Sequence, residues 1–122
     1  MAGYLKVQVE KFEVQSINLM VNAEILNDFQ RKLKQQNLMM NTVLTAFCRQ
    51  YVKGNYVLNE TDILRWENNN DETRMLNTTV DKEVYIKFKS KVKSEGYFLR
   101  YVLSAFIEDY NKNDLYLEFI RE

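Results

Sequence analysis

The chain has 122 residues, of which 46% are hydrophobic, with three glycines, no proline and a formal net charge of zero. This composition favours helices joined by short turns over a turn-rich sandwich or a disordered chain. Histidine is absent and Cys48 is the only cysteine, which excludes an internal disulfide, a single-chain Cys/His zinc site and a Ser/His or Cys/His nucleophile pair. We therefore expect no enzyme, no metal and no cofactor.

The first part of the sequence predicts extended structure followed by two helices. Residues 4–14 alternate apolar and polar positions, which indicates an extra edge strand or an arm. Residues 16–21 alternate in the same way and predict a half-buried strand. Asn22 stands at the N-cap position of a helix whose apolar residues recur at helical spacing. A break at Asn37 separates it from a second amphipathic helix, which Gly54 ends.

The second part repeats this order after a linker. The acidic linker, residues 54–73, contains a short helix signal over 59–67. Residues 75–80 then predict a strand and Asp81 an N-cap, with two further helices after it. In the tail, residues 113–122, the segment 114–120 fits either a strand or a helix. As a strand it is a candidate to pair with the N-terminal segment.

Self-comparison reveals an internal repeat that aligns residues 18–53 with residues 77–112. Without a gap, 12 of the 36 aligned positions are identical. The identical pairs include Asn18/Asn77, Phe29/Phe88, Lys32/Lys91, Phe47/Phe106 and Tyr51/Tyr110. Cys48 corresponds to Ile107, which predicts a core position for the thiol. One unit alone would expose a strand edge and half a core, so we expect two units with paired strands and interlocked helices.

This order of elements, with the spacing INLMVNAE…NLMMNTVLTAF…Y, resembles the ribbon-helix-helix DNA-binding fold of the Arc/MetJ type, once in 15–53 and once in 74–112. The resemblance implies a mainly α fold with a short two-stranded antiparallel ribbon. The length and hydrophobic content fit one globular domain over 1–122. The resemblance implies that the duplicated ribbon-helix-helix forms an intramolecular pseudo-dimer within it. A duplicated single chain is similar to TraY-type relaxosome accessory proteins of conjugative plasmids.

In that family the ribbon lies in the major groove of DNA and its outward side chains contact bases. The resemblance therefore implies base contacts from six residues: Ser16, Asn18, Met20, Met75, Asn77 and Thr79. The family also holds DNA phosphates at the start of the second helix. The positions that match are Met40, Asn41, Leu99 and Arg100. The chain departs from the family where Met39 and Phe98 replace the usual small polar N-cap.

Charge is distributed unevenly along the chain. Residues 13–53 carry five basic and three acidic residues, and 73–112 carry eight basic and five acidic. The segment between them, 54–72, has one basic and five acidic residues. Two mildly basic units are compatible with a nucleic-acid partner. Four lysines at alternate positions over 87–93 form two columns on a helix that the family turns away from DNA, and we predict a solvated face there.

Two functions follow as hypotheses. The first is sequence-specific binding of double-stranded DNA by a pseudo-dimeric monomer that associates on adjacent sites, as a transcriptional repressor or a relaxosome factor with a relaxase or another protein as partner. The alternative is a protein-interaction module, antitoxin-like or a phage inhibitor, that uses the fold without DNA. No segment resembles a signal peptide or reaches the roughly 18 apolar residues of a membrane span, so we expect a cytoplasmic protein with no membrane partner.

Overall fold

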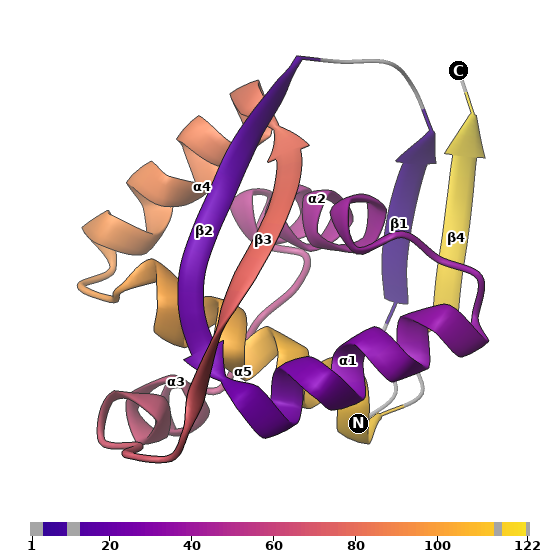
Figure 1. Cartoon of the computed structure of the whole chain (residues 1–122). Helices are drawn as coiled ribbons and strands as arrows, with labels where there is room; N and C mark the ends of the chain where they lie inside the picture. The colour runs from indigo at the N-terminus through magenta and orange to yellow at the C-terminus, as the bar shows by residue number, and fades with distance from the viewer. Residues whose placement is uncertain (1–3, 10–12, 114–115, 122) are drawn as a thin grey trace.

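Two strands that lie far apart in the sequence form an antiparallel ribbon along one side of the molecule (Figure 1). They are β2 (Val14–Asn22) and β3 (Thr73–Asp81), in a computed structural model that describes residues 4–9, 13–113 and 116–121. Their burial alternates, with Ile17 and Leu76 buried while their neighbours along the strand are exposed. This period of two places one face of the ribbon on the core and the other in solvent, so the predicted strands are confirmed.

Five helices account for most of the other residues that the structure describes. They are α1 (Ala23–Gln35), α2 (Met40–Val52), α3 (Glu60–Glu67), α4 (Lys82–Ser94) and α5 (Leu99–Lys112). The side chains of Asn22 and Asp81 cap α1 and α4, each accepting a 3.0 Å hydrogen bond from a backbone N–H of the first turn. Asn37 and Gly96 adopt positive φ angles of 56° and 83° after these helices. The predicted N-caps and helix breaks are therefore confirmed.

The elements before and after the linker correspond in the same register as the sequence repeat. β3, α4 and the first residue of α5 occupy the positions that the repeat aligns with β2, α1 and the first residue of α2. Backbone hydrogen bonds at the two ends of the ribbon correspond as well: Ala23 N donates to Glu72 O at 2.9 Å, and Lys82 N donates to Glu13 O at 2.8 Å.

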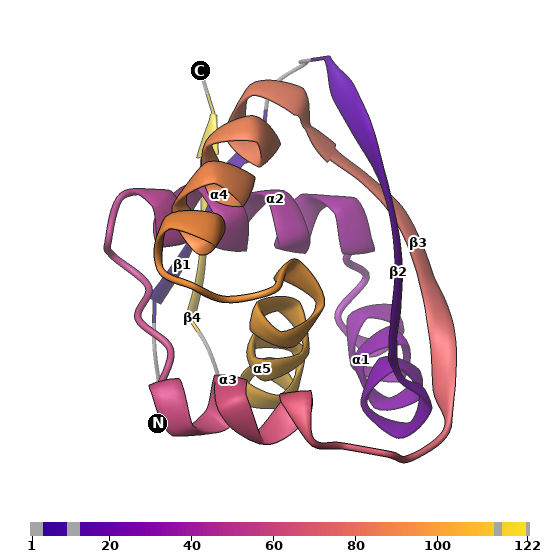
Figure 2. The same cartoon turned by 90° about the vertical axis from the view of Figure 1, so that its left-hand side faces the viewer.

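The helices cross between the halves of the chain. α1 packs on α5 and α2 packs on α4 (Figures 1 and 2). At the centre of the core the rings of Phe47 and Phe106 stack with centroids 4.0 Å apart and an interplanar angle of 14°. Cys48 is fully buried in the same core, as predicted. Each half therefore completes the core of the other.

A lysine on the first helix of each half caps the second helix of the other half. Lys32 Nζ donates to Tyr110 O at 2.6 Å, and Lys91 Nζ donates to Tyr51 O at 2.7 Å. Each ammonium also lies 5.1 Å from the ring centroid of the same tyrosine. Cations are favoured at helix C-termini and over aromatic faces. The prediction of a fully solvated lysine face over 87–93 is therefore wrong for Lys91.

The chain ends form a second, parallel sheet that the expected fold did not contain. β1 (Tyr4–Val9) pairs in parallel with β4 (Tyr116–Arg121), and β1 packs on α2 on the side of the helices away from the ribbon (Figure 2). Leu5 is fully buried there. The strand alternative for both segments is confirmed and the helical alternative for the tail is wrong.

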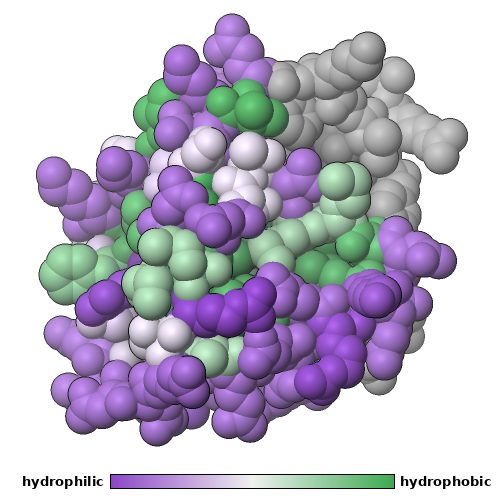
Figure 3. All heavy atoms as spheres, in the orientation of Figure 1, coloured by the Kyte–Doolittle hydropathy of each residue, from purple (hydrophilic) through white to green (hydrophobic). Residues whose placement is uncertain are grey.

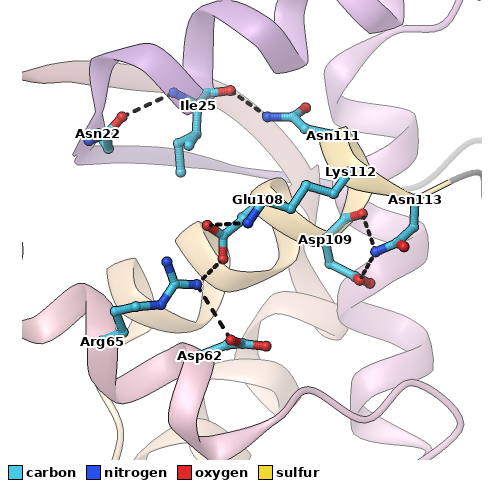
Figure 4. A network of polar contacts seen from close by, with 9 residues as sticks. All are labelled: Asn22, Ile25, Asp62, Arg65, Glu108, Asp109, Asn111, Lys112 and Asn113. Carbon is cyan, nitrogen blue, oxygen red and sulfur yellow. Dashed lines mark hydrogen bonds and ion pairs between the residues drawn. The ribbon is translucent and has the colours of Figure 1, made fainter. Parts of the chain in front are cut away.

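The linker helix is anchored by a polar network on α5 (Figure 4). Arg65 of α3 forms an ion pair with Glu108, whose side chain is 11% exposed, and with Asp62 at 3.4 Å. Lys112 approaches the other oxygen of Glu108 at 3.2 Å. Burial by itself would raise the pKa of the Glu108 carboxyl, but the hydrogen bonds from Arg65 and Lys112 outweigh it and lower that pKa. The short helix predicted in the linker is thus confirmed, and it docks through charge as well as apolar contact.

The central ring stack predicts a large cost for truncating Phe47. Phe47→Ala removes a fully buried ring between the two halves, so the free energy of unfolding should fall by about 3–5 kcal/mol. Denaturant titration followed by circular dichroism measures this change. Phe98→Ala is the matched control, because its ring is 66% exposed and its loss should cost less than about 1 kcal/mol. Equal losses in the two variants would contradict the central role of the stack.

The Glu108 network predicts an acid-dependent contribution to stability. The lowered pKa means that the carboxylate stabilises the fold above its unfolded-state pKa, near 4.5, and that this contribution is lost as the pH falls through the folded-state pKa. Glu108→Gln should therefore lower the free energy of unfolding by about 1–2 kcal/mol at neutral pH, and by less in acid. Urea titrations at neutral and acidic pH test this, with the exposed Glu67→Gln as control. A cost independent of pH would refute the assignment.

Candidate nucleic-acid interface

The outward face of the ribbon carries the six residues predicted to contact bases. Ser16, Asn18, Met20, Met75 and Asn77 are exposed, and Thr79 is half-buried. They lie in three opposed pairs across the strands: Ser16 with Thr79, Asn18 with Asn77, and Met20 with Met75. The structure thus brings all six together on one surface, without any charged side chain among them.

The pair Asn18 and Asn77 lies at the centre of this surface. The register places the two residues directly opposite each other, and they are also equivalent positions of the sequence repeat. Neither side-chain amide has a hydrogen-bond partner within the described parts of the chain. Both amides therefore have donors and acceptors that face solvent and are available to a ligand.

The starts of α2 and α5 flank the ribbon, since α2 packs on β3 and α5 on β2. Both helices begin after residues that make no side-chain cap, Met39 and Phe98, so backbone N–H groups of the first turns lack that partner. Of the four predicted phosphate contacts, Met40 and Leu99 pack partly against the core. Their side chains are thus occupied, and only their N–H groups are suited to an anion.

Arg100 supplies a cation at the start of α5. It is exposed, its Nη2 donates to the Tyr101 hydroxyl at 2.9 Å, and its guanidinium lies 5.0 Å from that ring centroid. In the described parts of the chain it forms no ion pair. Its counterpart Asn41 is uncharged, and its side-chain oxygen accepts a hydrogen bond from Thr42. The two flanks of the ribbon therefore differ in charge.

Exposed hydrophobic side chains also gather on this face. Met39 and Phe98 are 68% and 66% exposed, and the ribbon contributes Met20 and Met75. Figure 3 shows hydrophobic atoms across the middle of this view, over the ribbon and beside it, with hydrophilic atoms below over α1 and α3. The sequence signal was present, because Met39 and Phe98 occupy equivalent positions at helix starts, but their exposure depends on how the helices pack.

Arg74 is a residue that the sequence reasoning missed. It lies on β3 next to Met75, is exposed, and donates a hydrogen bond to the Asn27 side chain of α1. The only sequence signal was a basic residue inside a short strand. This contact fastens the end of the ribbon to α1.

The remaining chemistry of the described residues is limited. They contain no group of three His, Cys, Asp or Glu side chains positioned to hold a metal ion. Burial raises the pKa of the Cys48 thiol well above its ordinary value, so this cysteine is held as the unreactive thiol. Burial also raises the pKa of Tyr110 to about 12, while its hydroxyl donates to Gln36. These groups belong to the core and not to the ribbon surface.

Comparisons with known proteins yield no match: none to models of protein families, none to curated proteins and none to solved structures. Within the described residues, no helix is long and apolar enough to cross a lipid bilayer.

The two faces of the ribbon should respond differently to mutation. Asn18→Ala with Asn77→Ala removes exposed amides that have no partner among the described residues, so the free energy of unfolding should change by less than about 1 kcal/mol. Leu76→Ala, on the buried face, should cost about 2–5 kcal/mol. Denaturant titrations of the wild type and the two variants decide the point. A large loss in the double asparagine variant would mean that these amides are structural.

Proposed function

We propose that this chain binds double-stranded DNA in a sequence-specific manner, with the β2–β3 ribbon in the major groove. In this proposal the correspondence between the two halves reflects two ribbon-helix-helix repeats that form a pseudo-dimer within one chain, acting in the cytoplasm. The observation that carries it is the central pair Asn18 and Asn77, exposed on an antiparallel ribbon and without partners among the described residues. Such a ribbon fits the width of the major groove.

The chemistry of the outward face suits base recognition. An asparagine amide can pair with adenine through N6 and N7, which makes Asn18 and Asn77 candidates for two adenines on opposite strands. Met20 and Met75 offer apolar contacts to thymine methyl groups, and Ser16 and Thr79 offer hydroxyls. The repeat aligns Ser16 with Met75 and Met20 with Thr79. Because these equivalent positions carry different side chains, the two half-sites should differ in sequence.

The helix starts would hold the DNA backbone on either side. The first-turn N–H groups of Met40, Asn41, Leu99 and Arg100, together with the positive ends of the helix dipoles, favour phosphate. The Arg100 side chain adds a charge on one flank only. Phosphate binding should therefore be stronger on the α5 side than on the α2 side.

Repressor and relaxosome accessory factor are both compatible with this proposal. In the second role, which the single-chain arrangement of TraY-type proteins suggests, the chain would mark a plasmid origin for a relaxase. Each chain offers one short ribbon, so association of several chains on adjacent sites would raise the affinity.

A second candidate function is binding to another protein. The exposed side chains of Met39, Phe98, Met20 and Met75 and the zero net charge favour it, because exposed apolar clusters mark interaction surfaces. An antitoxin-like or inhibitor protein of this kind would cover the same face without DNA.

The decisive experiment selects bound fragments from random duplex DNA and then measures their affinity by gel shift. Asn18→Ala with Asn77→Ala should weaken binding to the selected site by at least about 30-fold, because each of the two bidentate contacts is worth roughly 1–3 kcal/mol, and should relax the preference at two adenines. Asn70→Ala, an exposed asparagine of the linker, is the matched control and should bind normally. Unchanged affinity and preference in the double variant would remove the ribbon from the readout.

Salt dependence separates the two candidate functions. Binding to phosphates releases counterions, so the affinity should fall as salt is raised, and Arg100→Gln should reduce the slope. Failure to retain any duplex at about 50 mM salt would overturn the DNA proposal and favour the protein-binding one.

A further inference from the structure

We infer that a groove between the end of α4 and the start of α5 binds a small amphipathic anion, a molecule with a flat apolar body and one carboxylate, phosphate or sulfonate. The groove has a volume of about 590 Å³ and mostly apolar walls. That volume lies within the range of ligand pockets, and apolar walls with a few polar groups are typical of them.

The body of the ligand would rest on hydrophobic and aromatic side chains. Leu19 of β2 and Val92 of α4 contribute apolar walls, and the rings of Phe98 and Tyr101 stand edge to face with centroids 5.8 Å apart. Phe98 makes this contact while remaining 66% exposed. A flat apolar molecule that covers this ring would remove its apolar surface from water, which favours binding.

The charge of the groove selects an anion. Lys89, Lys93 and Arg100 all contribute to its lining, and no carboxylate does so among the described residues. None of these three cations forms an ion pair in the described chain. A charge-assisted hydrogen bond from one of them would orient the acidic group of the ligand at the rim.

The corresponding region of the other half lacks this combination. The repeat places Gln30, Lys34, Met39 and Asn41 where the second half has Lys89, Lys93, Phe98 and Arg100. Two of the three cations and the aromatic ring are therefore missing there. One ligand per chain is expected, and the first half supplies matched control positions.

The site also touches the proposed DNA-binding surface. Arg100 lines the groove and is also a predicted phosphate contact, whereas Leu19 lines the groove from the core-facing side of β2. An anion held by Arg100 would compete with a DNA phosphate, so the ligand should weaken DNA binding. This regulatory part rests on the proposed function, whereas ligand binding itself does not.

Anilinonaphthalene sulfonate and its uncharged analogue phenyl-naphthylamine test the site with the same apolar body. By fluorescence and calorimetry, the sulfonate should bind the folded chain at one site, and Lys93→Gln or Arg100→Gln should weaken it about tenfold. The uncharged analogue should bind more weakly, and neither Lys93→Gln nor Arg100→Gln should change its affinity. Phe98→Ala should weaken both probes. The matched controls Lys34→Gln and Met39→Ala should leave both unchanged.

Equal effects of the groove variants and their controls, or the same affinity for both probes, would overturn the site. If the sulfonate binds as expected but leaves the affinity for a selected DNA fragment unchanged, the regulatory role is overturned. A chain that binds no DNA but binds the sulfonate in this groove would refute the proposed function alone.

Discussion

The antiparallel pairing of β2 with β3 is the constraint on which the rest of the structure depends. A single short strand leaves its backbone N–H and C=O groups without partners, and these two strands satisfy each other although the linker and two helices separate them in sequence. Because the two strands are antiparallel, the helices that follow them, α1 and α4, begin at opposite ends of the ribbon. They must then cross, which places Phe47 on Phe106 and the first helix of each half on the second helix of the other.

The linker and the chain ends, which lie outside the two repeated units, pack differently on the two halves. β1 covers α2, whereas α3 packs on α5 and is held there by Arg65 and Glu108. Tyr56 of the linker packs against both Phe47 and Phe106, and its hydroxyl donates to Asp109. The linker and the chain ends thus cover surfaces that the paired units would otherwise leave open, and each half is free to present different side chains beside the ribbon.

Local signals in the sequence were sufficient for the helices and for the two strands of the ribbon, but not for the N-terminal segment and the tail. Asn22 and Asp81 mark helix starts through their own hydrogen bonds, and the alternation around Asn18 and Asn77 separates a buried from an exposed face. The sequence did not predict that β1 and β4 pair in parallel, because alternation of apolar and polar residues specifies neither the partner of a strand nor its direction. Lys91 was assigned to solvent because its acceptor, Tyr51 O, lies on a helix that reaches it only through the crossing.

If the chain binds DNA as proposed, its zero net charge means that recognition should depend more on the ribbon side chains than on attraction to phosphates. Non-specific affinity for DNA rises with the number of phosphates that a protein neutralises, and Arg100 is the one cation among the four residues proposed to contact phosphates. Under the proposed function this chain should therefore bind random DNA weakly, so that its specificity ratio rests on the uncharged outward side chains. The same uncharged surface with Met20 and Met75 exposed would serve a protein partner, which is why the salt dependence of binding, and not the fold, discriminates between the two functions.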